Sequence, residues 1–404
     1  MNRFRSSART AHLPDHFFSN LVNKVNEVIG QGFDVINLGQ GTPDRPTPPH
    51  IVASLQEASQ LQIYQKYSPF DGLAELRAAI AHRYFEDYGV RLDPDSEVAV
   101  LFGGKTGLVE LSLCLLDPGD ICLLPDPGYP DYLSGVALAQ AVPHFMPLVQ
   151  SNQYLPDFTA IGEETWNKAK LMFLNYPNNP TAALAPYEFY EETVKLASKH
   201  GFAVASDFAY GSLGFDHCKP VSFLQIPGAK DVGVELYTLS KTYNMSGWRV
   251  AFVLGNREIV QQINRLQEHL FVSLFPAVQV AATTALLSSQ DCVEQIRSMY
   301  ESRRNALFGA LNEIGWEAEK PRGSFFSWLP IPNDMNCESF CNRLLHEAKV
   351  MVAPGIGFGR YGSEYVRVGL LANEERLIEA VSRIEKLHFS FKRGSEKWIG
   401  SGAS

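Results

Sequence analysis

A lysine and an arginine stand eight positions apart in the segment Leu239–Arg249 (LSKTYNMSGWR), which follows a short apolar run. A lysine that forms a Schiff base must lie beside its cofactor and be able to lose a proton, and Lys241 could serve in this way. Arg249 carries a permanent charge on a planar fork, which suits a phosphate dianion. One loop could therefore hold both ends of one phosphorylated ligand. A surface lysine and a solvated arginine would give the same spacing.

Two further segments place polar side chains after apolar runs. Asp207 and Tyr210 follow Ala203–Ser206, where a carboxylate could pair with a protonated pyridine nitrogen and a phenol could bind a ring oxygen. Asn179 follows another run and could donate to the same oxygen, its position fixed by Pro180, a candidate for a cis peptide bond. Taken singly, each of these residue types is also common in ordinary turns and helix caps.

A glycine-rich link, Phe102–Gly107 (FGGKTG), joins a predicted strand to a predicted helix. Backbone amides and the helix dipole make such a helix start an anion site. Gly104, Lys105 and Thr106 also fit the end of a nucleotide-binding P-loop, but Ala99 replaces the first glycine of that motif. The link therefore predicts a phosphate-binding cup. The alternative is a helix start that binds no ligand.

Other residues could contact a substrate. Arg367 lies on the alternating strand Tyr365–Gly369, where it could bind an α-carboxylate or point outward from an edge. Tyr129 could stack on a cofactor ring or pack in the core. Phe17 and Phe18 could close over an apolar side-chain pocket or form the apolar face of the first helix. No arginine in the sequence stands out as a binding residue for a second substrate carboxylate. Its absence favours a substrate with a neutral or thioether side chain.

The elements that must position these residues alternate short apolar runs with helical patterns. This alternation is typical of an α/β fold with a mainly parallel sheet covered on both faces, which binds ligands at the carboxyl ends of its strands. We expect a large domain at 47–290, a smaller α+β domain from 1–46 and 291–404, and one long helix over about 275–313. The predicted strands of the large domain lie at 98–102, 121–124, 169–175, 203–207, 236–239 and 250–254.

Composition excludes several classes of function. The 404 residues are 45% hydrophobic and 20% charged, as in globular proteins, and no apolar run reaches the roughly twenty residues of a membrane span. The formal net charge of -9 gives no basis for binding a nucleic-acid backbone. The six cysteines are scattered and indicate reduced thiols rather than a metal site. Without a secretory signal, we expect a cytoplasmic protein.

In this order, the segments resemble the class I/II aminotransferases of PLP fold type I over essentially the whole chain. The resemblance implies pyridoxal 5′-phosphate as cofactor, with Lys241 as the Schiff-base lysine and catalytic proton carrier. It also implies that Asp207 pairs with the pyridine nitrogen, that Tyr210 and Asn179 bind the ring oxygen, and that Arg249 binds the phosphate. The other implied positions are a phosphate cup of Ser240, Gly104, Lys105 and Thr106, a stacking Tyr129, and a carboxylate site of Gly41, Asn179 and Arg367.

The resemblance also implies a homodimer. Tyr67 matches the tyrosine that the neighbouring subunit lends to the phosphate. The chain departs from the family at Ala182, where glycine is usual, and at Lys105, where a small residue is common. Neither departure removes a charged catalytic group, so we expect activity.

Within the family, the chain looks most like the bacterial methionine-salvage aminotransferases, which convert 4-methylthio-2-oxobutanoate to methionine. We expect ping-pong transfer of an amino group between an amino acid and a 2-oxo acid. Aromatic, kynurenine-type or LL-diaminopimelate substrates stay open, as does a β-carbon–sulfur lyase on the same fold. A cofactor-sensing regulator would need a DNA-binding helix-turn-helix, which we do not find before the main domain. A dehydrogenase would need a G-x-G-x-x-G after its first strand, and none is present.

Overall fold

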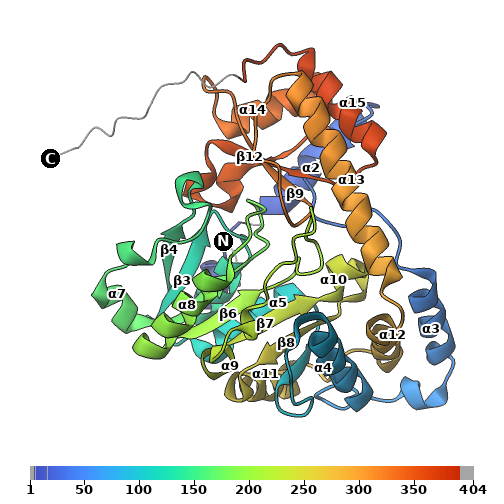
Figure 1. The fold of residues 1–404 in the computed structure, drawn as a ribbon, viewed down its shortest axis with the longest axis vertical. Helices are drawn as coiled ribbons and strands as arrows, with labels where there is room; N and C mark the ends of the chain where they lie inside the picture. The colour runs from blue at the N-terminus through green and yellow to red at the C-terminus, as the bar shows by residue number, and fades with distance from the viewer. Residues whose placement is uncertain (1–3, 5, 16, 392–404) are drawn as a thin grey trace.

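The structure is a computed structural model that describes residues 4, 6–15 and 17–391. Its lower part is built around a twisted sheet, and its narrower upper part is joined to it by the long helix α13 (Asp291–Glu313) (Figure 1). Within the described residues, no helix is long and apolar enough to cross a membrane.

The central sheet has seven strands in the order β2-β8-β7-β6-β5-β3-β4. Only β8 runs opposite to the other six strands, so the expected mainly parallel sheet is confirmed. The sequence did not reveal the reversed strand, because a strand buried on both faces is apolar in either direction. The strand bounds are β2 Val98–Leu101, β3 Ile121–Asp126, β4 Val142–Pro147, β5 Ala169–Leu174, β6 Ala203–Asp207, β7 Gly233–Thr238 and β8 Ala251–Gly255.

Helices cover both faces of this sheet. One apolar cluster joins Ile80 and Tyr190 to one face, and a second joins Leu111, Val136 and Ile263 to the other. Burial on both sides explains why all four residues of β2 are buried. The first face carries α4 (Ala74–Tyr88), α8 (Tyr187–His200) and α12 (Pro276–Leu287), and the second α5 (Gly104–Leu115), α6 (Tyr132–Ala139) and α11 (Arg257–Leu270).

The upper part combines the two ends of the chain around its own core, which includes Trp316, Phe340 and Leu377. Its three-stranded antiparallel sheet has the order β11-β12-β9, and a short parallel pair joins β1 to β10. This arrangement agrees with the expected α+β part, and the boundaries at residues 46 and 290 stay a prediction. The elements are α2 Phe17–Gly30, β1 Ile36–Asn37, β9 Phe326–Pro330, α14 Cys337–Arg343, β10 Val350–Met351, β11 Ala353–Pro354, β12 Tyr365–Gly369 and α15 Glu374–Glu385.

The expectation of one helix over 275–313 was wrong, because α12 ends at Leu287 and α13 begins at Asp291. Between them the backbone of Ser288 is extended. The side chain of Gln290 donates to the carbonyls of Ala285 and Ser288, at 3.1 and 2.7 Å. These bonds satisfy carbonyl groups that the end of a helix leaves without partners. The apolar periodicity runs through the break and did not reveal it.

Candidate active site

A cavity of about 530 Å³ lies at the carboxyl edge of the central sheet, below the upper part. Strand ends of the lower part form one wall, and α2, β9 and β12 contribute the other. Twelve of the residues predicted from the sequence line it together: Phe18, Gly41, Gly104, Lys105, Tyr129, Asn179, Asp207, Tyr210, Ser240, Lys241, Arg249 and Arg367.

Lys241 reaches this cavity from the single-turn helix α10 (Leu239–Thr242), which directly follows β7. The hydroxyl of Thr238 accepts from the amide of Ser240 at 3.2 Å and caps this turn. The ammonium Nζ donates to the carbonyl of Gly41 at 2.7 Å. Burial, then the nearby charges of Arg367 and Arg249, lower the pKa of Lys241 from 10.5 to about 8, against the opposing effect of Asp207. The amine is therefore able to lose its proton near neutral pH.

Asp207 ends β6 and is buried at the base of the cavity. Its carboxylate accepts from the hydroxyl of Tyr132 at 2.9 Å and from the amide of Ala209 at 3.3 Å. Burial raises the pKa of Asp207 from 3.8 to about 6, and these two bonds act against the rise.

Tyr132 is a site residue that we did not predict. It is the first residue of α6, and its ring stacks on Phe173 with 5.0 Å between centroids. The only signal in the sequence is its place three residues after Tyr129, which lines the same cavity. That spacing did not show whether Tyr132 would bind Asp207 or pack as an ordinary core tyrosine.

The loop after β5 is held by Asn175. Its Nδ2 donates to the backbone carbonyl of Asp207 at 2.7 Å, and its Oδ1 accepts from the amide of Asn179 at 2.7 Å. The Asn179–Pro180 peptide bond is cis, as the sequence suggested. These contacts fix the loops after β5 and β6 against each other.

Arg367 is 1% exposed and lies on β12 of the upper sheet. It donates through Nη1 to Oδ1 of Asn179 at 2.9 Å and through Nη2 to the carbonyl of Gly39 at 3.0 Å. Burial lowers the pKa of Arg367 to about 10. Among the described residues no carboxylate pairs with Arg367, so an anionic ligand would supply the missing charge. Aromatic rings surround the guanidinium, at 4.0 Å for Phe326, 4.6 Å for Phe358 and 5.3 Å for Phe18.

The start of α5 forms a cradle beside Arg249. Gly103 has φ +87°, and a Cβ atom on it would overlap the guanidinium of Arg249. Arg249 is anchored by a bond from Nη1 to the carbonyl of Ser246 at 2.9 Å. Backbone amides at the helix start, the anchored guanidinium of Arg249 and the hydroxyl of Ser240 are the kinds of donor that bind a phosphate group.

Some predicted residues lie elsewhere. Thr106 and Tyr67 are not among the residues that line the cavity, and Tyr67 is 91% exposed. Phe17 does not line it either, because its ring packs on the backbone of Gly357. Lys105 does line it, and it forms an ion pair with Asp131 at 3.0 Å.

The family model for aminotransferases of class I and II matches residues 34–384 of this chain. The chain is a class I/II aminotransferase. This aminotransferase depends on pyridoxal phosphate, as its family does, so the predicted fold class, reaction class and cofactor are confirmed.

Similar proteins include several with assigned substrates. The glutamine–4-(methylsulfanyl)-2-oxobutanoate aminotransferase of Bacillus subtilis is 55% identical, and the alignment covers 98% of this chain and all of that protein. An LL-diaminopimelate aminotransferase of Desulforudis audaxviator is 41% identical over 94% of this chain and 97% of that one. The substrate-bound structure of BacF from Bacillus subtilis superposes with a TM-score of 0.93 at 45% identity, covering 96% of this chain and 99% of that one.

Proposed function

We propose that this aminotransferase forms methionine from 4-methylthio-2-oxobutanoate, with glutamine as the amino donor. The relative at 55% identity acts on these substrates according to its name. In the structure, the observation that carries the proposal is one cavity with a buried Arg367 at one side and an apolar wall from α2. The guanidinium suits the α-carboxylate of either substrate, and a thioether suits the wall. Three side chains of α2 line the cavity: Phe18, Leu21 and Val22.

The residues of the cavity fit pyridoxal phosphate. When bound, this cofactor supplies an aldehyde that links to amines and a ring that withdraws electrons. Lys241 offers the amine for the aldehyde, and Asp207 offers a buried carboxylate for the ring nitrogen. The cradle at Gly103 and Arg249 would hold the phosphate. The remaining assignments are Gly104, Lys105, Thr106 and Ser240 in the phosphate cup, Tyr210 and Asn179 at the ring oxygen, and Tyr129 against the ring.

Lys241 and Arg367 have different roles in the proposed reaction. Arg367, with Asn179 and the backbone at Gly41, binds the substrate carboxylate and so directs the α-carbon toward Nζ of Lys241. With the substrate held in this way, Nζ of Lys241 would take the proton from the α-carbon and return it during transfer of the amino group. Its lowered pKa lets one amine accept and return a proton near neutral pH. The second substrate reverses these steps, which makes the reaction ping-pong.

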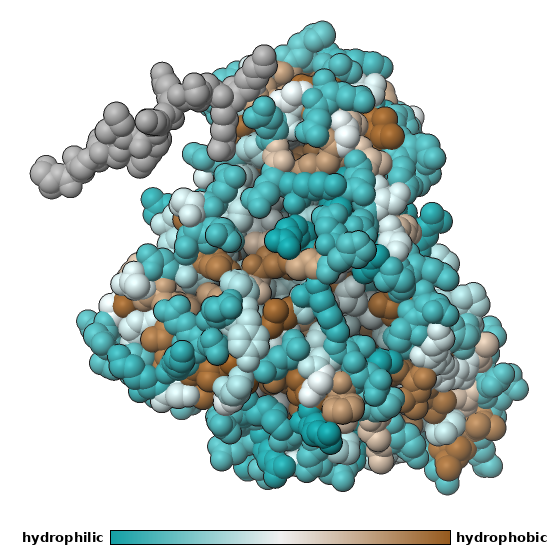
Figure 2. All heavy atoms as spheres, in the orientation of Figure 1, coloured by the Kyte–Doolittle hydropathy of each residue, from teal (hydrophilic) through white to brown (hydrophobic). Residues whose placement is uncertain are grey.

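We also propose a homodimer in which Tyr67 completes the phosphate site of the neighbouring subunit. Tyr67 is 91% exposed, and apolar side chains are exposed on the same stretch of chain. Hydrophobic residues gather at the lower right of Figure 2, where the segment between α3 (Pro49–Ser59) and α4 lies in Figure 1. Besides Tyr67, the large apolar side chains exposed on this segment are Leu61, Ile63 and Phe70. We place the enzyme in the cytoplasm, since all six of its cysteines are unpaired.

A panel of 2-oxo acids, each assayed with glutamine, glutamate and branched-chain donors, tests the substrate by kcat/KM. We expect 4-methylthio-2-oxobutanoate with glutamine to rank first. Faster turnover of LL-diaminopimelate, or of aromatic or kynurenine-type substrates, would contradict the proposal. Product release from cystathionine without any 2-oxo acid would instead reveal a carbon–sulfur lyase.

The apolar wall is tested by Val22→Lys. We expect kcat/KM for the thioether acceptor to fall by about tenfold, because a charge replaces one apolar contact of the side chain. Ile29→Lys is the matched control, since Ile29 is exposed on the same helix and does not line the cavity. Equal activity of the two variants would remove α2 from the substrate site.

A further inference from the structure

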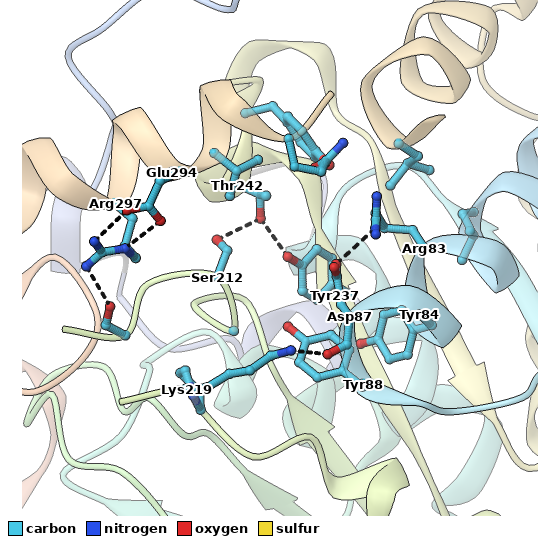
Figure 3. Close-up of a pocket in the computed structure, with 18 of the residues that line it drawn as sticks. Arg83, Tyr84, Asp87, Tyr88, Ser212, Lys219, Tyr237, Thr242, Glu294 and Arg297 are labelled. Atoms are coloured by element: carbon cyan, nitrogen blue, oxygen red, sulfur yellow. Dashed lines mark hydrogen bonds and ion pairs between the residues drawn. The ribbon is translucent and has the colours of Figure 1, made fainter. Parts of the chain in front are cut away.

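A second cavity, of about 380 Å³, lies on the other side of α10 from the active site. Lys241 lines the first cavity and the next residue, Thr242, lines the second. Figure 3 shows the second cavity, in which Thr242 and Ser212 approach each other above the ring of Tyr237. The aminotransferase reaction assigned above makes no use of these side chains.

Three hydroxyl groups meet at Thr242. Ser212 donates from Oγ to Oγ1 of Thr242 at 3.2 Å, and the hydroxyl of Tyr237 lies 2.9 Å from the same atom. Thr242 is 3% exposed and Tyr237 is 6% exposed, so water competes little for these bonds. We call Ser212, Tyr237 and Thr242 the hydroxyl clip.

Each member of the clip belongs to an element that carries a site residue. Ser212 is two residues after Tyr210, on the loop that begins at Asp207. Thr242 directly follows Lys241, and Tyr237 lies on β7, the strand that leads into α10. The clip therefore ties the loop of Asp207 and Tyr210 to the helix that carries the lysine.

The surroundings of the clip are closely packed. The ring of Tyr237 stacks on Phe252 with centroids 5.5 Å apart, and Tyr84 meets it edge-on at 5.8 Å. Charged groups in the same cavity pair with one another, such as Arg297 with Glu294 at 2.6 Å. The packing of its ring thus positions the hydroxyl of Tyr237 beside Thr242.

We propose that Thr242 is a positioning residue that fixes Nζ of Lys241 relative to Asp207 and Tyr210. The helix α10 spans only Leu239–Thr242, and a single helical turn is not stable without outside contacts. Small displacements of a reacting group slow a reaction strongly, because near-attack geometry is narrow. This proposal rests on the assignment of Lys241 as the proton carrier.

The test compares Thr242→Val, which keeps the shape and removes the hydroxyl, with Thr242→Ser, which keeps the hydroxyl. For the Val variant of the holoenzyme we expect kcat to fall about tenfold while KM for the amino donor changes by less than about twofold. We also expect a shift of at least about half a unit in the midpoint pH at which the absorbance of the cofactor on Lys241 changes. The Ser variant should restore both quantities.

The matched control is Tyr243→Phe. Tyr243 lines the same cavity and follows Thr242, but its hydroxyl donates to Gln290 at 2.6 Å, away from the clip. We expect this variant to keep wild-type kcat and midpoint pH. Ser212→Ala removes one bond to Thr242 and provides a second variant if the Val protein does not fold.

An unchanged kcat and midpoint in a folded Thr242→Val protein would overturn the proposal, even if its melting temperature fell. Equal losses in the Val and Ser variants would also overturn it, because the hydroxyl would then be irrelevant. Failure of the assignment of Lys241 as the proton carrier, on which the proposal rests, has a different signature. In that case Lys241→Ala would retain turnover and the cofactor absorbance, whatever the Thr242 variants did.

Discussion

Burial shifts the pKa of three charged residues that line the cavity of this aminotransferase. Lys241 and Arg367 are cations that lose part of their hydration, and Asp207 is a carboxylate that does the same. Each therefore shifts toward its neutral form and gains most from an oppositely charged ligand. In the proposed assignment, pyridoxal phosphate would offer its aldehyde to Lys241 and its basic ring nitrogen to Asp207, and an amino acid would offer its carboxylate to Arg367. The predictions at this scale concern protons and charges.

The first prediction is that capture of pyridoxal phosphate by the apoenzyme accelerates with rising pH, with a midpoint near pH 8. The amine attacks only when neutral, and the lowered pKa of Lys241, about 8, sets the midpoint. Stopped-flow absorbance across pH 6 to 10 on the apoenzyme measures the rate. A midpoint near 10.5, the ordinary value for lysine, would show that burial does not perturb this amine.

The second prediction is that Tyr132→Phe moves the acid limb of the pH profile upward. The hydrogen bond from Tyr132 lowers the pKa of Asp207, so its removal raises that pKa further above 3.8 and protonates the carboxyl at higher pH. The variant should lose kcat/KM at pH 6 and keep it near pH 8. A uniform loss at every pH would show instead that Tyr132 supports only packing against Phe173.

The third prediction is that Arg367→Lys raises KM for both the amino donor and the 2-oxo acid. A lysine cannot bind Asn179, Gly39 and a carboxylate with one planar fork, so we expect kcat/KM to fall about 100-fold. The affinity for pyridoxal phosphate should stay within about twofold, since Arg367 is proposed to bind the substrate and not the cofactor. Loss of cofactor affinity would place Arg367 in the cofactor site.

At the scale of elements, the site depends on where strands end and helices begin. β5, β6 and β7 end side by side in the sheet, so Asn179, Asp207 and Lys241 meet although they are far apart in sequence. The start of α5 meets them because β2 ends at the same edge. Close backbone approach at this start requires glycine.

The fourth prediction is that Gly103→Ala lowers the affinity of the apoenzyme for pyridoxal phosphate by at least about tenfold. The new Cβ would displace Arg249 and would also strain a backbone at φ +87°. Gly119→Ala is the matched control, because Gly119 has φ +92° but no atom within 4 Å of the new Cβ. Absorbance titration measures both affinities. Equal weakening in the two variants would assign the effect to backbone strain alone.

Much of the site could be predicted because it lies directly after buried strands. Apolar runs end at recognisable residues, so Asp207, Lys241 and the glycines after β2 stood out. The reversed direction of β8 and the break between α12 and α13 left no comparable signal. Tyr132 was missed because its role depends on which strand lies beside which, and that order is a tertiary property. The hydroxyl clip was missed for the same reason.

At the scale of the molecule, one chain supplies most of the cavity, and Tyr67 is proposed to come from a second copy. The fifth prediction is complementation between Lys241→Ala and Tyr67→Ala. In a mixed dimer, one site carries both changes and the other carries neither, since each site takes its lysine and its tyrosine from different subunits. Random mixing of equal amounts should restore activity to roughly a quarter of wild type. No gain over the separate variants, or a monomer by sedimentation, would contradict the dimer.

The antiparallel strand β8 has one further consequence. Because it runs back along β7, a short connection brings both Lys241 and Arg249 to the same edge of the sheet, while Arg367 arrives from the upper part. Lys241 and Arg249, the two proposed anchors of the cofactor, should therefore keep their places as long as this hairpin stays folded. As the urea concentration rises, the enzyme should therefore lose its affinity for amino acids before it releases the cofactor. Its activity should disappear at a lower urea concentration than the visible absorbance of the bound cofactor.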